Sequence, residues 1–209
     1  MVLTLPAVFL LLEDLRRRSI FGSRDLWKAL WPYAALSGIF LIIALFGKQD
    51  IVTRLSVIQT ALMACKSTMI YFQKLVWPNA FSVIYPQVGP INFGALEFQL
   101  AVSFMVALLA FVFVSRRWSR LPSFALGAFL ITVLPTYSNF SKGGDIFFAS
   151  DRYAYMPSVF LFILIAAFFY WLVTQRWAIG QAAQWILGIA TFWLLLGLGW
   201  KSHAQSLTW

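Results

Sequence analysis

Asp151 and Arg152 are the residues of this chain best placed to do chemistry. They belong to the stretch Phe147–Ser158, in which an acid and a base stand next to Tyr153 and Tyr155 and just before a long apolar run. Charged groups beside hydrocarbon are costly and tend to face a cavity, a partner or a substrate. Because an arginine can donate two hydrogen bonds to one phosphate, the pattern indicates binding of a lipid-linked phosphate.

A structural role is the simpler interpretation of the same residues. Asp151 would cap the helix that follows, which has Pro157 in its first turn. Arg152 would pair with Asp151 or with a lipid phosphate. Both interpretations stay open at the level of the sequence.

Two upstream lysines and two isolated carboxylates are further candidates. Lys66 and Lys74 are eight residues apart, about two helical turns, and therefore share one helix face. They indicate either a solvated face or a basic strip that lines a site for an anionic headgroup. For Glu97 and Asp145 a helix cap is the simpler role, and contact with a metal or a sugar hydroxyl is the alternative.

No complete catalytic set can be assembled from this sequence. Its one cysteine and one histidine, Cys65 and His203, exclude an intrachain disulfide and a zinc-type cluster. The sequence contains no Ser-His-Asp set, phosphate-binding glycine loop or pair of catalytic carboxylates. The catalytic residue is therefore unknown, no cofactor is assignable, and a divalent metal has no support.

The composition indicates an integral membrane protein. Hydrophobic residues make up 61% of the chain and charged residues only 11%. The formal charge of +9 does not indicate nucleic-acid binding, because no soluble segment interleaves basic and aromatic residues. Basic residues at the ends of membrane spans, next to anionic headgroups, account for this charge.

The apolar runs predict an all-α fold, a polytopic transmembrane helical bundle that forms one domain over residues 1–209. A crossing needs about 20 residues. Val2–Leu12 is too short and is interpreted as the end of a truncated helix, so the chain resembles a fragment. The five predicted full spans are Leu30–Gly47, Phe98–Val114, Phe124–Tyr137, Tyr155–Val173 and Ala182–Trp200.

The distribution of lysine and arginine predicts the orientation. The loops 13–29, 115–121 and 174–181 are short and basic, so they are assigned to the cytoplasmic face. The segments 48–97 and 138–154 and the C-terminus then lie on the periplasmic or lumenal face, most simply of a bacterial inner membrane. The mixed polar and apolar residues of 48–97 predict interfacial helices.

Four motifs in this order resemble the membrane domain of a glycosyltransferase family. The family comprises the GT-C-type enzymes related to TPR-containing protein O-mannosyltransferases, including many bacterial members. Val2–Asp14 is similar to its V-T-L-P helix end, and Tyr71–Pro78 with Tyr85 and Pro86 to its Y-x-x-K-L-x-W-P…Y-P segment. Asp151–Ser158 is similar to its D-R-Y-x-Y-x-P-S motif, and Trp200–Trp209 to the ending that leads into the repeats.

This resemblance implies transfer of a sugar from a polyprenyl-phosphate donor on the outer face. Such a transfer needs a base for the acceptor and a cation for the leaving phosphate. The family's catalytic acids lie in an upstream loop that is not matched here, and its repeats are also missing. The residues implied to bind the donor are Asp151, Arg152, Tyr153, Tyr155, Lys74 and Tyr85.

The chain is thus expected to be part of such an enzyme, with membrane lipid, the polyprenyl-phosphate sugar donor, and other membrane subunits or a TPR module as partners. A non-catalytic integral membrane subunit of a larger complex is the alternative from another class. A transporter is a weaker third, because the sequence has no internal repeat and no charge in the middle of a predicted span.

Overall fold

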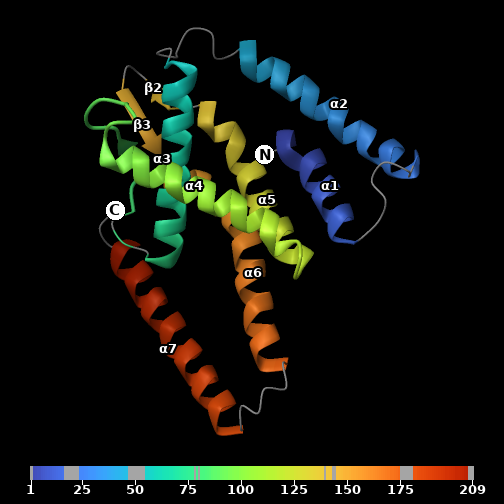
Figure 1. Cartoon of the computed structure of the whole chain (residues 1–209), viewed down its shortest axis with the longest axis vertical. Helices are drawn as coiled ribbons and strands as arrows, with labels where there is room; N and C mark the ends of the chain where they lie inside the picture. The colour runs from blue at the N-terminus through green and yellow to red at the C-terminus, as the bar shows by residue number, and fades with distance from the viewer. Residues whose placement is uncertain are drawn as a thin grey trace.

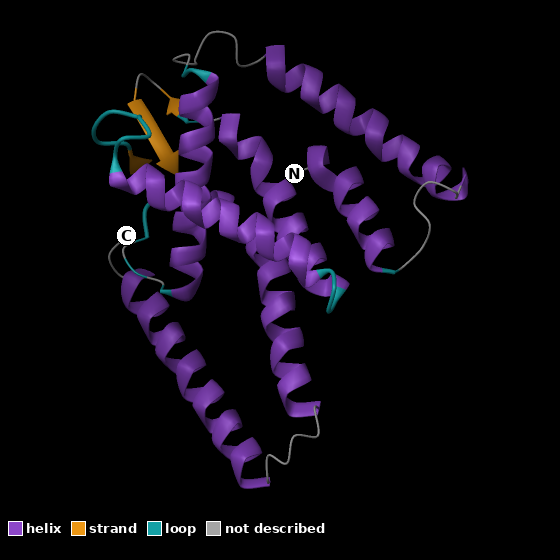
Figure 2. Cartoon of the chain, viewed as in Figure 1, coloured by secondary structure: helices purple, strands orange, loops and turns teal. Residues whose placement is uncertain are grey.

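Helices make up most of this chain, and one small sheet lies at the edge of the helical body (Figures 1 and 2). The computed structural model describes residues 2–16, 24–46, 55–77, 79, 81–138, 140–142, 145–174 and 181–206. The α-helices are α1 (Leu5–Leu15), α2 (Arg24–Phe46), α3 (Val57–Val76), α4 (Leu96–Ser115), α5 (Arg120–Val133), α6 (Tyr155–Thr174) and α7 (Gln181–Ser206). The strands are β1 (Tyr85–Pro86), β2 (Ser141–Lys142) and β3 (Asp145–Ala149), and the 3-10 turns are η1 (Val2–Thr4), η2 (Leu134–Ser138) and η3 (Asp151–Tyr153).

Helix α3 begins at a capping box and carries part of the core. The Ser56 hydroxyl accepts a hydrogen bond from the Gln59 amide at 3.2 Å, and the Gln59 side chain accepts one from the Ser56 amide at 2.9 Å. This reciprocal pair satisfies two of the backbone N–H groups that a helix start leaves unpaired. Met63 and Thr68, on the inner face of the helix, are completely buried. The local sequence therefore sets where α3 begins, and its buried face sets where it packs.

Aromatic rings join α3, α4 and α5. The Phe72 ring of α3 meets the rings of Phe104 in α4 and Phe129 in α5 edge to face, with centroids 5.4 and 5.0 Å apart. Edge-to-face contact brings the positive edge of one ring against the negative face of the other. Phe98 and Phe129 are almost fully buried. Helices α1 and α6 pack in turn on α5, so α5 lies in the middle of the helical body.

The sheet holds the segment that leads into η3. Strand β3 is central and pairs antiparallel with β1 and β2, so that Tyr85 lies opposite Ala149 and Ser141 opposite Ile146. The Gln87 amide continues the ladder by donating to the Ile146 carbonyl at 2.9 Å. Gly89 turns the chain away from the sheet at φ 93°, in the region that favours glycine. The pairing brings residues 85 and 149 side by side although the sequence separates them widely.

Figure 1 shows α6 and α7 extending away from the core in the same direction, and α2 lying beside α1 at the periphery. These outer helices expose many large apolar side chains. Phe168 and Trp171 of α6 and Phe192 and Trp193 of α7 are each exposed by 48% or more. Large exposed apolar surfaces mark contacts with membrane or with other proteins.

The prediction of a polytopic bundle with about five full spans is wrong. Within the described residues, two helices are long and apolar enough to cross a membrane, Asp25–Ile43 and Leu96–Ser115. They overlap two of the predicted spans, Leu30–Gly47 and Phe98–Val114. The all-α prediction also omitted the sheet formed by β1, β3 and β2.

The three other predicted spans are not among these two helices. Helix α5 has 14 residues, about 21 Å, and ends in the 3-10 turn Leu134–Ser138. This is shorter than the roughly 30 Å hydrocarbon core, and many of its residues are buried by other helices. The apolar part of α6 is the shorter run Tyr155–Trp171. The run predicted at 182–200 lies in α7, where most side chains of the first half fall outside the described residues.

The predicted interfacial segment 48–97 contains a core helix. Helix α3 buries Leu62, Lys66 and Tyr71 against its neighbours, and it contacts both α4 and β3. Residues 48–54 of the predicted segment lie outside the described part of the chain. Some of the polar residues that predicted an interfacial helix, Lys66 among them, are therefore buried inside the protein.

Candidate functional site

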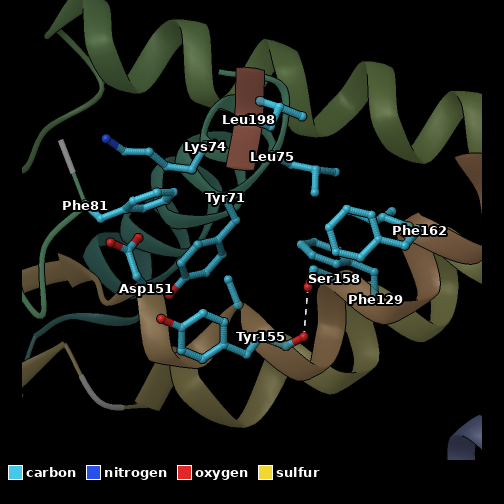
Figure 3. Close-up of a pocket in the computed structure, with 12 residues that line it drawn as sticks. Tyr71, Lys74, Leu75, Phe81, Phe129, Asp151, Tyr155, Ser158, Phe162 and Leu198 are labelled. Carbon is cyan, nitrogen blue, oxygen red and sulfur yellow. Dashed lines mark hydrogen bonds between the residues drawn. The ribbon is translucent and has the colours of Figure 1, made fainter. Parts of the chain in front are cut away.

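A pocket of about 310 Å³ opens where α3, η3, α6 and α7 approach one another (Figure 3). Tyr71, Lys74 and Leu75 of α3 form one wall, and Asp151, Ala154 and residues of α6 form the other. The remaining lining residues are Phe81, Phe129, Tyr155, Ser158, Leu161, Phe162 and Leu198. Residues between positions 71 and 198, far apart in the sequence, thus contribute to one concavity.

The pocket is polar at one end and apolar at the other. Figure 3 shows Lys74, Asp151 and the hydroxyl end of Tyr155 on one side, and Leu75, Phe129, Phe162 and Leu198 on the opposite side. Ligand pockets are commonly apolar with a few polar groups that orient the ligand. An amphipathic molecule with a polar head and a hydrocarbon tail matches this division.

The carboxylate of Asp151 is held by neutral donors from Ser82 and from the first residue of β1. The Ser82 amide donates to Oδ2 at 2.6 Å, and the Tyr85 hydroxyl lies 2.9 Å from Oδ2 and 3.1 Å from Oδ1. The Asp151 amide donates back to the Ser82 carbonyl at 3.4 Å. Asp151 therefore fastens η3 to residues 82–85 and caps no helix through its side chain.

Tyr85 lies between the acid and the pocket's lysine. The Lys74 ammonium lies 5.2 Å from the centroid of the Tyr85 ring, within cation–π range. Burial, and after it the hydrogen bond to Asp151, raises the pKa of the Tyr85 hydroxyl well above its usual range. Tyr85 consequently stays a neutral donor to the carboxylate at physiological pH.

Lys74 is positioned by the end of its own helix. Its ammonium donates to the Asn79 carbonyl, and the Asn79 side-chain oxygen lies 3.5 Å away. A lysine ammonium carries a full positive charge and three donors, and this chemistry suits a phosphate oxygen. Lys74 is thus the cationic group of the pocket wall.

Tyr71 forms the buried floor beside this polar end. It is 4% exposed, and its hydroxyl accepts a hydrogen bond from the Ser150 amide at 3.4 Å. Burial raises the pKa of the Tyr71 hydroxyl. Tyr71 and Lys74 are three residues apart and lie on one face of α3, as the spacing of the Y-x-x-K motif implies.

The predicted donor residues divide into two groups. Asp151, Tyr155 and Lys74 line the pocket, and Tyr85 contacts both Asp151 and Lys74. Arg152 and Tyr153 do not line it. The Arg152 side chain is exposed and lies against Tyr153, with 5.0 Å from its guanidinium carbon to the ring centroid and a hydrogen bond of 3.2 Å to the hydroxyl.

Lys66 and Lys74 do not form a common basic strip. Lys66 is 8% exposed and donates to Glu97 at 2.9 Å and to Gln87 at 2.8 Å. Its ammonium also lies 4.2 Å from the centroid of the Phe148 ring in β3. Lys66 thus joins α3, the start of α4 and the sheet behind the pocket, as a structural cation.

Several residues of this site were not predicted from the sequence. Ser82 holds Asp151 through its backbone, which no side-chain pattern reveals. Phe129 and Leu198 reach the pocket from α5 and α7, far away in sequence. Ser158 lies within the motif Asp151–Ser158, and its hydroxyl donates to the Tyr155 carbonyl at 2.8 Å. Only Ser158 carried a sequence signal, namely its place in that motif.

The described residues contain no group of three His, Cys, Asp or Glu side chains that could hold a metal ion. Of the two isolated carboxylates, Glu97 pairs with Lys66, and the Asp145 side chain lies outside the described atoms. The chemistry of the pocket therefore rests on one ammonium group, one carboxylate and hydroxyl groups.

Comparison of the chain with protein-family models, with curated proteins and with solved structures gives no match.

Proposed function

We propose that this chain is part of a GT-C-like membrane glycosyltransferase and that its pocket binds the head of a polyprenyl-phosphate sugar donor. The observation that supports this proposal is the meeting of two motifs at one pocket. Lys74 and Tyr85 come from the first motif and Asp151 and Tyr155 from the second, and the family resemblance links the same two motifs.

The division of the pocket fits a lipid-linked phosphate. Lys74 offers a positive charge to the phosphate at the polar end, and charge-assisted hydrogen bonds are the stronger ones. Phe129 and Leu75 offer an apolar surface to the first part of the hydrocarbon chain. A volume of about 310 Å³ is at the lower end of the roughly 300–1,000 Å³ of ligand pockets, so it suits a headgroup rather than a whole lipid.

The remaining hydrocarbon would leave the pocket along α6. Phe162 lines the pocket and is also 55% exposed, and Val159 and Ile163 beside it are exposed by 48% and 44%. These side chains continue the apolar end of the pocket onto the outer surface of α6. A long polyprenyl chain would cover them and remove that apolar area from water.

Asp151 acts as a positioning residue in this proposal. Its two oxygens accept from the Ser82 amide and the Tyr85 hydroxyl, so it orders the wall that carries Tyr85. A general base must reach the proton that it removes, and a carboxylate with these partners is poorly available for that task. The base for the acceptor is assigned to a different segment or chain.

Binding of undecaprenyl monophosphate to the purified chain in detergent tests the proposal. Lys74→Met should weaken binding about 10- to 100-fold, because it removes a charge-assisted hydrogen bond worth roughly 1.5–3 kcal/mol. Lys28→Met, at an exposed lysine of α2, is the matched control and should change the dissociation constant less than two-fold. The measurement is titration followed by native mass spectrometry.

Two results would count against the donor site. Equal binding by the wild type and Lys74→Met would remove Lys74 from phosphate recognition. Equal binding of undecaprenol, which lacks the phosphate, would show that the pocket recognises hydrocarbon alone.

A non-catalytic integral membrane subunit is the second candidate. It is favoured by the occupied carboxylate of Asp151 and by the exposed apolar side chains of α4, among them Phe111 and Phe113. Sugar transfer by the complete complex separates the two candidates. A subunit of this kind would tolerate Lys74→Met with unchanged transfer, whereas the donor site would not.

A further inference from the structure

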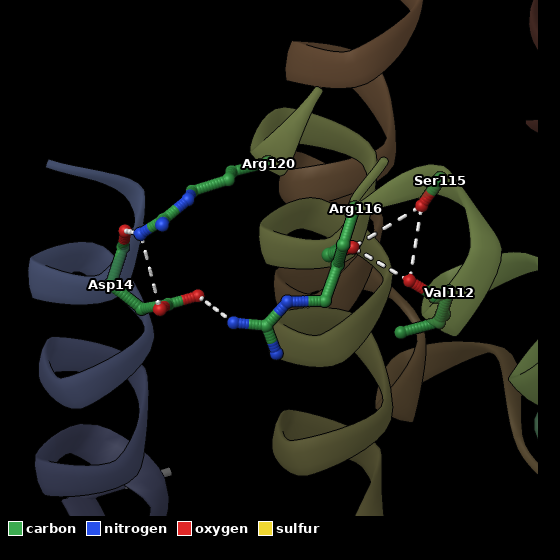
Figure 4. A network of polar contacts seen from close by, with 6 residues as sticks. Asp14, Val112, Ser115, Arg116 and Arg120 are labelled. Carbon is green, nitrogen blue, oxygen red and sulfur yellow. Dashed lines mark hydrogen bonds and ion pairs between the residues drawn. The ribbon is translucent and has the colours of Figure 1, made fainter. Parts of the chain in front are cut away.

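A second polar cluster lies at the other end of α4, away from the sheet and its Lys66–Glu97 pair. There the end of α1 meets the turn between α4 and α5 (Figure 4). Arg116 donates to Asp14 Oδ2 at 2.6 Å, and Arg120 donates to the Asp14 carbonyl at 2.7 Å and lies 3.4 Å from Oδ1. One carboxylate thus receives two guanidinium groups.

The cluster carries more positive than negative charge. Arg16 pairs with Glu13 at 3.4 Å beside Asp14, and Arg117 is exposed with no ion-pair partner in the described part of the chain. The acids of α1 are therefore outnumbered by the four arginines Arg16, Arg116, Arg117 and Arg120. Since the side chains of Arg116 and Arg120 are still 49% and 38% exposed, they can contact a further anionic partner.

Buried serines keep the turn between α4 and α5 in a fixed shape. The Ser115 hydroxyl, 1% exposed, donates to the Val112 carbonyl at 3.1 Å and lies 3.2 Å from the Ser123 hydroxyl. The Ser123 hydroxyl also donates to the Val112 carbonyl, at 2.6 Å. The Ser119 side chain accepts from the Leu121 amide and begins α5. The arginines are therefore presented on a rigid corner.

The same corner exposes a large aromatic side chain. Trp118 is 77% exposed, between Arg117 and Ser119. Tryptophan prefers the boundary between hydrocarbon and headgroups, where its ring is covered and its N–H stays in a polar layer. Helix α4 is 20 residues long and is one of the two helices within the described residues that are long and apolar enough to cross a membrane. If α4 crosses, the corner lies at headgroup level.

We infer that the corner Arg116–Arg120, together with the end of α1, binds the phosphate headgroups of anionic phospholipids in the adjoining leaflet. Arg117 and the free faces of Arg116 and Arg120 contact the phosphates, and Trp118 lies among the upper acyl chains. Asp14 holds Arg116 and Arg120 in place and lowers the local surplus of charge. The inference needs only membrane insertion of α4 and is independent of the donor pocket.

Retention of lipid by the purified chain in dodecyl maltoside tests the inference. Phosphatidylglycerol and phosphatidylcholine are offered in equal amounts, and bound lipid is counted by native mass spectrometry. Phosphatidylglycerol should be preferred, and Arg117→Gln should weaken its binding about five-fold, the equivalent of roughly 1 kcal/mol per basic residue near an anionic surface. Raising the salt from low to high concentration should weaken it further.

Asp14→Asn should change phosphatidylglycerol binding in the direction opposite to Arg117→Gln. Removal of this negative charge should strengthen phosphatidylglycerol binding by about two- to five-fold, although the protein becomes no more stable. A purely structural ion pair would leave lipid binding unchanged. Arg152→Gln is the matched arginine control at an exposed position of η3, and it should change the preference less than two-fold.

Two outcomes would overturn the inference. In the first, both lipids are retained equally, or Arg117→Gln and Asp14→Asn leave the preference unchanged. In the second, glycerol 3-phosphate, which has the phosphate but no acyl chains, competes as well as phosphatidylglycerol at the same concentration. The corner would then bind a free phosphate rather than a lipid surface. Trp118→Ser, which should reduce retention of both lipids, shows whether the acyl chains contribute.

Discussion

Two aspartates in this molecule are each held by donors from distant segments, and the donors differ in charge. Asp151 accepts from a tyrosine hydroxyl and a backbone amide beside the pocket. Asp14 accepts from the guanidinium groups of Arg116 and Arg120 at the corner between α4 and α5. Both contacts fasten pieces of chain that lie more than 60 residues apart.

The difference between the donors decides what each region can bind. Neutral donors hold the Asp151 carboxylate without cancelling its charge, so the pocket lining keeps a negative group as well as the positive Lys74. Cationic donors cancel the charge of Asp14 and exceed it, so the corner stays positive. The first arrangement suits a ligand with both a phosphate and hydroxyl groups, and the second suits a surface of anions.

The largest expected effect is on the free energy of unfolding, which should fall more when Asp151 is replaced than when Asp14 is. Asp151→Ala leaves the Ser82 amide and the Tyr85 hydroxyl without their acceptor, and this should lower the free energy of unfolding by about 2–3 kcal/mol. Asp14→Ala removes partly exposed ion pairs and should cost about 0–1 kcal/mol. Denaturant unfolding of the purified chain in detergent measures both values. Equal losses for the two variants would contradict the comparison.

The second effect concerns pH and applies only to the Asp151 region. Folding raises the pKa of Tyr85, so the folded state holds the hydroxyl proton more tightly than the unfolded state does. The resulting stability is complete below the ordinary tyrosine pKa of about 10 and is lost as the pH rises above it. Unfolding measured from pH 8 to 11 should show this decline, and Tyr85→Phe should reduce its slope. A slope that Tyr85→Phe does not change would assign the decline to other groups.

The smallest effect is expected at Arg152. Its guanidinium group lies on the Tyr153 ring outside the pocket, so Arg152→Gln should change undecaprenyl monophosphate binding less than three-fold, far less than Lys74→Met. The two variants are compared in the same titration. A loss at Arg152 equal to that at Lys74 would show that ligand binding draws Arg152 into the site, and would make it the phosphate-binding arginine that the sequence predicted.

The positions of the helices were largely predictable from the sequence, but the number of helices long and apolar enough to cross a membrane was not. Long apolar runs without internal breaks favour helix, and α2, α4 and α6 lie close to the predicted segments. Hydropathy does not distinguish a helix that faces lipid from one that is covered by other helices. Helix α5 shows the difference, because its apolar residues Phe124 and Phe129 pack inside the protein and the helix ends after 14 residues.

The site was predictable in part. The motif resemblance grouped Lys74, Tyr85 and Asp151, which lie close together in the structure, and it also included Arg152, whose side chain lies on Tyr153 outside the pocket. Ser82 acts through its backbone amide, and Phe129 and Leu198 act through position alone, so their residue types carry no signal. Lys66 carried a misleading signal, because a lysine in a helix of mixed polar and apolar residues is usually exposed to solvent.

The sequence by itself determined the helical character of the chain, its positive charge and the adjacent acid and base at Asp151 and Arg152. Those properties depend on residue type and on neighbours within a few turns. The tertiary structure decided that Asp151 is held by Ser82 and Tyr85, that Lys66 is buried against Glu97, and that Asp14 gathers Arg116 and Arg120. These pairings join residues 31 to 106 positions apart, and only the packing of whole helices can select such partners.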